Sequence, residues 1–91
     1  MTDSESPEEL LQFPCQIDIK VMGRAEEGFT GLVVEIVKRH APDLDPEAVS
    51  TRNSRRGNYV SVTVSVQAQS RQQMDALYRE LTSHEKVAVA L

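Results

Sequence analysis

A ten-residue segment in the second half of the chain constrains the fold more than any other. Between Tyr59 and Ala68 every second residue is apolar, and the residues between them are polar, mainly Ser and Thr. This period of two is typical of a β-strand with one buried face and one hydrated face. The apolar series is Val60, Val62, Val64, Val66 and Ala68. Such a strand needs neighbouring strands to pair with and a second layer to cover its apolar face.

Three more segments have strand patterns. Cys15 to Val21 alternates in the same way, and Gly23 follows it, which we interpret as a strand breaker. Val49 to Ser54 is extended but mostly polar, which is typical of an edge strand, and residues 55–58 then form a hairpin turn before the central strand. Val87, Val89 and Leu91 indicate a fourth strand.

Two segments have the period of a helix. From about Glu27 to His40 apolar residues recur at steps of three and four, and Pro42 fixes the C-terminal limit. Ser70, with Gln73 three residues later, is typical of a capping box that starts a second helix, which ends near Ser83. The apolar stripes are Phe29, Leu32, Val33, Ile36 and Val37 in the first helix, and Met74, Leu77, Tyr78 and Leu81 in the second.

The order of these elements predicts an α+β protein with the ferredoxin-like βαββαβ fold. Two helices cover one face of a four-stranded antiparallel sheet. The first and third strands have the longest apolar series, so we expect them in the centre, in the order 4-1-3-2. The opposite face stays open to water, to a partner or to a second subunit. Its expected residues are Gln16, Asp18, Lys20, Tyr59, Ser61, Thr63 and Ser65.

Charge divides the chain into two parts. Of its 91 residues, 10 are Lys or Arg and 14 are Asp or Glu, and the net charge of −4 equals the charge of Asp3, Glu5, Glu8 and Glu9. We interpret residues 1–9 as a disordered acidic tail and residues 10–91 as a single domain whose charges balance. A balanced domain has no overall field to attract polyanions, which disfavours nucleic acid and membranes as partners.

Residues suited to catalysis or metal binding are few. The single Cys15 cannot form an internal disulfide, and an acidic N-terminus without an apolar run is not a secretory signal, so we expect a cytoplasmic protein. His40 and His84 lack metal-ligand spacing, and no nucleophile with a neighbouring base is visible. We predict no catalytic residue, no metal and no cofactor, and therefore a protein that is not an enzyme.

One basic cluster is a candidate binding site. Arg52, Arg55 and Arg56 lie on the predicted hairpin, where they suit a phosphate, RNA or an acidic protein surface, or form a solvated turn. Arg56, Gly57 and Tyr59 partly match the basic-Gly-aromatic signature of RNA-recognition motifs. A stacking platform needs several rings, however, and Tyr59 is alone on its strand.

Four strings of residues together give a family resemblance. They resemble the YbeD family of small uncharacterised bacterial proteins. The strings are FPCQIDIKVMG (Phe13 to Gly23), VVEIVKRHAP (Val33 to Pro42), GNYVSVTV (Gly57 to Val64) and LYREL (Leu77 to Leu81). The resemblance covers almost everything after the acidic tail. It implies a ferredoxin-like fold similar to the ACT regulatory domains that bind amino acids, and a link to lipoyl-group metabolism through gene neighbourhood. It implies no catalytic residues.

The ACT resemblance draws attention to the segment after the first strand. A turn there that ends in Gly can admit a ligand carboxylate to the start of the first helix, which makes Gly23 and Arg24 candidate binding residues. The Asp-Arg-Pro-Gly type of turn found in many ACT domains is absent, and Glu26 and Glu27 place two carboxylates where an anionic ligand would dock.

The sequence thus predicts a non-catalytic regulatory or adaptor domain that acts by protein contact or by binding a small metabolite. We expect a monomer or a weak homodimer, with contact through the edge strands or the open sheet face. The alternative is an anion- or nucleic-acid-binding module that uses the hairpin arginines. The candidate ligand- or partner-binding residues are Gly23, Arg24, Arg52, Arg55, Arg56 and Tyr59.

Overall fold

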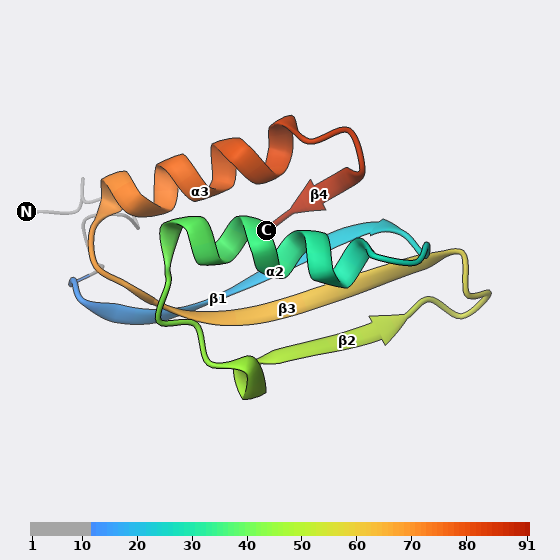
Figure 1. Cartoon of the computed structure of the whole chain (residues 1–91), viewed down its shortest axis with the longest axis horizontal. Helices are drawn as coiled ribbons and strands as arrows, with labels where there is room; N and C mark the ends of the chain where they lie inside the picture. The colour runs from blue at the N-terminus through green and yellow to red at the C-terminus, as the bar shows by residue number, and fades with distance from the viewer. Residues whose placement is uncertain (1–11) are drawn as a thin grey trace, which may run out of the picture.

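The computed structural model describes residues 12–91. In chain order the elements are β1 (Cys15–Arg24), α2 (Phe29–His40), a short 3-10 helix η1 (Pro46–Ala48), β2 (Val49–Asn53), β3 (Tyr59–Ala68), α3 (Arg71–Ser83) and β4 (Val87–Ala90) (Figure 1). The predicted acidic tail, residues 1–9, lies outside the described residues, so the predicted domain boundary stays a prediction.

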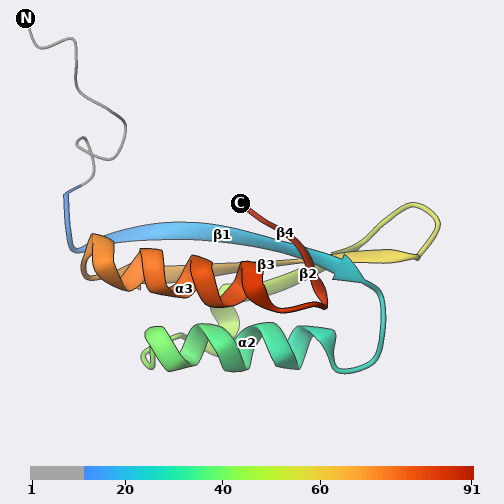
Figure 2. The same cartoon turned by 90° about the horizontal axis from the view of Figure 1, so that it is seen from above.

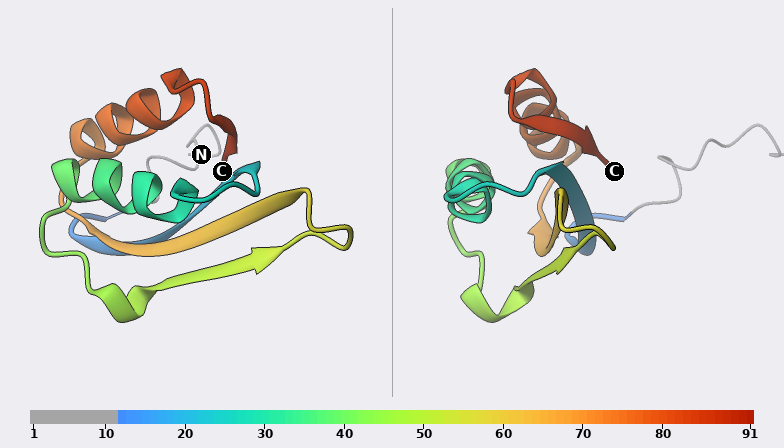
Figure 3. Two further views of the ribbon diagram at one scale, coloured as in Figure 1. Left: turned by 45° about the vertical axis from the view of Figure 1, so that its right-hand side comes forward. Right: turned by 90° about the vertical axis from the view of Figure 1, so that its right-hand side faces the viewer.

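The four strands form one antiparallel sheet in the order β2-β3-β1-β4. Both helices lie on the same side of this sheet, as the end-on view shows (Figure 3, right), and the view from above shows α2 and α3 running along the strands (Figure 2). This arrangement confirms the predicted ferredoxin-like fold and its strand order. Among residues 12–91 no element covers the other face of the sheet.

The core lies between the sheet and the two helices, and aliphatic side chains fill it. Every second residue of β3 from Val60 to Ala68 is buried, as the alternation predicts. Phe29, at the first turn of α2, is the only aromatic side chain buried in residues 12–91. The largest fully buried side chains are Ile19, Ile36, Leu77, Leu81, Val21, Val33, Val37, Val62, Val64 and Val66.

The two helices start differently. At α3 the Ser70 hydroxyl accepts a hydrogen bond from the Gln73 backbone N–H (3.1 Å), which confirms the predicted cap. The Gln73 side chain accepts from the backbone N–H of Gln69 rather than from that of Ser70. At α2 the cap is Gly28 in the left-handed region (φ 90°), a conformation that glycine adopts without strain, so the helix begins at Phe29 and not at Glu27.

Gly23 does not end the first strand, contrary to the sequence interpretation. β1 continues through Gly23 to Arg24, and all ten of its residues pair with β3. A side chain at position 23 would place its Cβ 2.5 Å from both the Lys86 carbonyl oxygen and the Phe29 ring. The glycine is needed because α2 and the segment before β4 approach the strand too closely for any side chain.

The last strand contains an irregularity that simple alternation hides. Its register with β1 shifts between Met22 and Gly23, so that Val87 pairs with Gly23 while Val89 pairs with Met22. Val87 is therefore buried under the helices, and Val89 lies on the open face. Leu91 exchanges both backbone hydrogen bonds with Lys20, which places Leu91 on the open face as well.

Candidate functional site

The open face of the sheet is divided into two chemically different ends. Directly paired residues of antiparallel strands point to the same face, so the strand register shows which residues lie on the open face. On β1 and β3 the pairs are Gln16 with Gln67, Asp18 with Ser65, Lys20 with Thr63, Met22 with Ser61, and Arg24 with Tyr59.

The end near the start of β1 is polar and bonded within itself. Gln16 Nε2 donates to Ser65 Oγ (3.1 Å), and Ser65 Oγ donates to the Asp18 carboxylate. The one charged side chain described at this end, Asp18, is therefore hydrogen-bonded within the sheet.

The end near the hairpin is apolar and basic. Tyr59, Val89 and Leu91 are 49, 39 and 65% exposed, and they are the large hydrophobic side chains exposed within residues 12–91. All of them lie on the open face, around Met22. We define the apolar-basic patch as Met22, Tyr59, Val89 and Leu91 with the basic residues Lys20, Arg24, Arg52 and Arg55.

A hollow of about 450 Å³ opens within this patch. Met22, Arg52, Arg55 and Tyr59 are among the residues that line it. Tyr59 also borders a second hollow of about 510 Å³, which Arg24, Glu85 and the Glu26–Lys86 ion pair line as well. The tyrosine ring therefore stands between two depressions, each with an arginine at its margin.

The basic side chains of the patch are not held in ion pairs by the described part of the chain. Its basic side chains, and Arg56 on the adjacent turn, form no ion pair with any of residues 12–91. By contrast, Arg39 contacts Glu35 and Glu80 on the helical side of the molecule. The only acidic residue on the open strands, Asp18, lies at the polar end and is bonded to Ser65.

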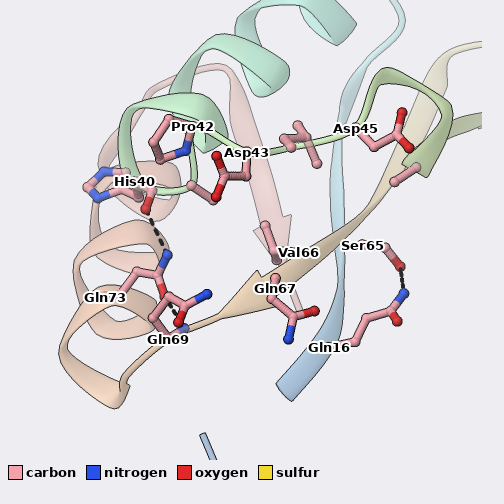
Figure 4. A pocket seen from close by; sticks show the side chains of 13 residues that line it. Gln16, His40, Pro42, Asp43, Asp45, Ser65, Val66, Gln67, Gln69 and Gln73 are labelled. Carbon is pink, nitrogen blue, oxygen red and sulfur yellow. Dashed lines mark hydrogen bonds between the residues drawn. The ribbon is translucent and has the colours of Figure 1, made fainter. Parts of the chain in front are cut away.

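A further hollow, of about 420 Å³, lies at the opposite end of the molecule, between the end of α2 and the start of α3 (Figure 4). Gln73 lies at one edge of it, donating from Nε2 to the His40 carbonyl oxygen (2.8 Å) and accepting from the Gln69 backbone N–H (2.6 Å). Asp45, on its rim, accepts from the Glu47 backbone N–H. The Gln73 bond to His40 joins the start of α3 to the end of α2, and the Asp45 bond caps η1, so these groups have structural roles.

A family model described as "Protein of unknown function (DUF493)" matches residues 8–91 of this chain. The chain belongs to this family. Its similar curated relatives are UPF0250 proteins. One from Neisseria gonorrhoeae is 44% identical over 91 residues, and the match covers 100% of this chain and 100% of the relative. One from Nitrosomonas europaea is 45% identical over 84 residues, which cover 92% of this chain and 97% of the relative.

Two solved structures resemble the DUF493 chain. Protein HP0495 from H. pylori has a TM-score of 0.73 at 17% identity, and the match covers 100% of this chain and 93% of that one. The ACT domain from GTP pyrophosphokinase of Chlorobium tepidum has a TM-score of 0.66 at 10% identity, over 85% and 83% of the two chains. At these identities the likeness shows the fold. The expected resemblance to the YbeD family and to ACT domains is thereby confirmed.

Four of the six predicted site residues of this DUF493 chain meet at the apolar-basic patch. Arg24 lies opposite Tyr59, while Arg52 and Arg55 line the same hollow as Tyr59. Arg56 lies on the turn beyond, and it does not line that hollow. Gly23 is on the other face, buried against Phe29, where it serves packing. A binding role for these residues stays a prediction.

The sequence analysis missed three members of the patch. Met22 lay beyond the predicted end of the first strand, and Val89 and Leu91 carried the same alternation as the buried Val87. A glycine within a strand is one signal of a bulge in the neighbouring pairing, so Gly23 could have indicated the shifted register.

Within the described part of this DUF493 chain, groups with catalytic potential have structural roles. His40 Nε2 lies 2.7 Å from Glu80 Oε1 and joins α2 to α3, and Cys15 packs half-buried against the core. Burial raises the pKa of the Tyr78 hydroxyl above its ordinary value. In residues 12–91 no cluster of three or more His, Cys, Asp or Glu residues is able to hold a metal ion. No helix there is both long and apolar enough to cross a membrane.

Proposed function

We propose that this DUF493 protein is a non-catalytic regulatory or adaptor domain that acts by protein contact through the apolar-basic patch. The observation that carries the proposal is the position of Tyr59, Val89 and Leu91. These exposed apolar side chains all gather on the sheet face opposite α2 and α3. Apolar side chains grouped in this way on a water-facing surface mark an interaction site more often than scattered ones do.

The ACT-like fold supports a regulatory role, because ACT domains occur attached to an enzyme, as in the GTP pyrophosphokinase of Chlorobium tepidum. The arrangement of reactive groups supports a role without catalysis. His40 is engaged by Glu80, and the hydroxyls of the open strands have no imidazole among their hydrogen-bond partners in residues 12–91.

Binding of a small metabolite, including the lipoyl-related acids that the family resemblance suggests, is the second mode of such a domain. The backbone N–H groups at the start of α2 would attract an acidic metabolite. Glu26 and Glu27 border the hollow there, however, and their carboxylates would repel it. A thermal-shift screen with amino acids and lipoyl-related acids separates the two modes. A concentration-dependent rise in Tm with one of these compounds would favour metabolite binding over protein contact.

One observation favours an anion- or nucleic-acid-binding function as a second candidate. Arg52, Arg55 and Arg56 lie on one hairpin and form no ion pair within residues 12–91. Fluorescence anisotropy with single-stranded RNA at low and high salt tests it, because phosphate contacts by arginine weaken steeply as salt rises. Salt-sensitive binding that charge reversal of these arginines abolishes would support this second function.

Site-specific photo-crosslinking tests the proposed surface. The photoreactive amino acid benzoylphenylalanine is similar in shape to tyrosine and replaces the half-exposed Tyr59 in the intact chain, which is then irradiated inside the native cell. We expect discrete adducts, which mass spectrometry identifies as the same partner in replicate cultures.

The matched control carries the same photoreactive group on the helical side, at the exposed position Arg79 of α3. Adducts with one partner at position 59 and their absence at position 79 support protein contact through the patch. Adducts at both positions alike, or at position 79 alone, would show that the open face is not the contact surface.

A further inference from the structure

The size of the apolar-basic patch limits what it is able to bind. It extends across all four strands and over about four residues of β1. With strands about 4.8 Å apart and a rise of about 3.3 Å per residue, it measures roughly 15 Å by 15 Å, on the order of 200 Å². A stable interface between folded proteins takes about 800 Å² from each partner. The patch by itself fits a short segment of polypeptide better than the flat surface of a domain.

The charges around the patch define the complementary chemistry. Lys20, Arg24, Arg52 and Arg55 surround apolar side chains and lack acidic partners in residues 12–91. Arginine binds carboxylates with two parallel hydrogen bonds, and such pairs gain strength next to apolar groups that exclude water. An occupant with carboxylates at its margins and apolar side chains at its centre would match this arrangement.

Other occupants match less well. Two copies of this chain stacked patch to patch would bring Arg24, Arg52 and Arg55 of one copy close to those of the other, which like-charge repulsion opposes. A single-stranded nucleic acid needs several rings on which to stack its bases, and Tyr59 is the only aromatic residue on the open strands.

From these observations, and resting on the proposed function, we propose that the partner of this domain presents a short acidic segment with apolar side chains, which lies across the apolar-basic patch. An apolar side chain of the segment occupies the hollow between Met22 and Tyr59, where about 450 Å³ is available. Carboxylates that flank this side chain pair with Arg52 and Arg55 on one side and with Arg24 on the other.

Selection from a random nonapeptide library displayed on phage tests this inference with the full chain as the immobilised target. We expect the enriched peptides to combine an excess of Asp and Glu with at least one apolar side chain. A synthetic copy of the most enriched peptide then serves as the probe in fluorescence anisotropy at low and high salt.

Two variants separate the charged from the apolar contribution. Replacing both arginines of the hollow, Arg52→Glu with Arg55→Glu, should weaken peptide binding by about tenfold or more and reduce its salt dependence, since only Lys20 and Arg24 remain to attract the carboxylates. Tyr59→Ala should weaken binding to a similar degree while leaving the salt dependence in place. Both sites are exposed, and circular dichroism checks that the variants fold.

The matched control is Arg79→Glu, a charge reversal of the same kind on the exposed side of α3. It should leave the affinity for the peptide unchanged. Equal losses in this control and in the hairpin variant would show that only the net charge of the chain matters, which would overturn the proposal.

Other results would also overturn it. These are enrichment of basic or neutral peptides, no enrichment at all, or acidic peptides that bind the Arg52→Glu, Arg55→Glu variant as tightly as the unmodified chain.

If single-stranded RNA displaces the acidic peptide and binds more tightly, the occupant is nucleic acid. If ultracentrifugation shows a dimer that Tyr59→Ala dissociates, the occupant is a second copy. If neutralising Asp3, Glu5, Glu8 and Glu9 raises the peptide affinity, the occupant is the chain's own N-terminal segment.

This selection and the photo-crosslinking experiment fail independently. Adducts at position 59 together with non-acidic peptides would leave the proposed contact surface standing and refute only the chemistry of the partner. Absence of adducts at position 59 would refute the contact surface itself, whatever peptides the selection yields.

Discussion

At the scale of single residues, two glycines of similar appearance in the sequence have opposite roles. Gly23 lies in β1, where a Cβ atom would approach the Lys86 carbonyl oxygen and the Phe29 ring to 2.5 Å. Gly31 lies in α2, where an added Cβ would have no heavy atom within 4 Å apart from its chain neighbours and the backbone of its own helix. Only the structure separates these cases, because the atoms that crowd Gly23 come from distant parts of the chain.

Gly23→Ala should therefore destabilise the fold, while Gly31→Ala should stabilise it. The first change overpacks a site bounded partly by rigid backbone, at a cost of about 1–3 kcal/mol. The second improves helix propensity in open space, by about 0.5–1 kcal/mol. Urea unfolding of both variants measures these shifts. Equal effects of the two substitutions would contradict the packing role assigned to Gly23.

Tyr78 gives a prediction for alkaline pH. Burial disfavours its charged phenolate, so the pKa of Tyr78 in the folded chain lies above the ordinary 10.0. The corresponding stabilisation is complete below that ordinary pKa and is lost as the pH rises through the higher folded-state pKa. In a Tyr59→Phe variant, where Tyr78 is the remaining tyrosine, phenolate absorbance should titrate above pH 10 when the chain is folded and near pH 10 in concentrated urea. Identical midpoints in both conditions would refute this.

At the scale of helices and strands, local patterns predicted most of the fold. The alternation from Tyr59 to Ala68 and the stripe from Phe29 to Val37 indicated the correct elements, because the side chains that create these patterns are the ones that the core buries. The errors arose where a long-range contact decides. Gly23 looks like a strand breaker in the sequence because the close approach of Phe29 is visible only in the structure. The register shift opposite Met22 depends on the pairing of two strands that are distant in sequence.

The candidate site was predictable only in part for the same reason. Arg52, Arg55 and Tyr59 are close in sequence, so the hairpin brings them together. Val89 and Leu91 lie beside them because of the bulge in β4, and no local sequence pattern predicts that bulge.

The link between the helices gives a prediction at this scale. Gln73 connects the start of α3 to the end of α2, through its bonds to Gln69 and His40. Gln73→Ala removes both side-chain bonds and should cost about 1–2 kcal/mol in urea unfolding. Gln72→Ala is the matched control, since Gln72 is exposed in the same helical turn and should change stability by less than about 0.5 kcal/mol. Similar losses in the two variants would show that these bonds do not stabilise the helix pair.

At the scale of the whole molecule, the buried core and the proposed contact surface lie on opposite faces of one sheet. The helical face holds the buried residues, and the open face holds the exposed apolar side chains with their unneutralised basic neighbours. A division of this kind allows the contact residues to change without loss of the fold.

This division predicts that stability and binding respond separately to mutation. Tyr59→Ala and Arg52→Glu alter exposed side chains, so each should shift the unfolding free energy by no more than about 0.5 kcal/mol. The same substitutions should weaken binding of the unlabelled chain to the partner that photo-crosslinking identifies. Variants that lose the partner only in proportion to a loss of folded protein would contradict the separation.

The central claim, that the partner binds on the open sheet face, is tested most directly by amide NMR of the ¹⁵N-labelled chain titrated with the crosslinked partner. We predict chemical-shift changes concentrated in the second half of β1, the first half of β3, β2 and β4, with the outer residues of α2 and α3 unchanged. Shifts concentrated on the helices, with the signals of Met22, Tyr59 and Val89 unmoved, would contradict it.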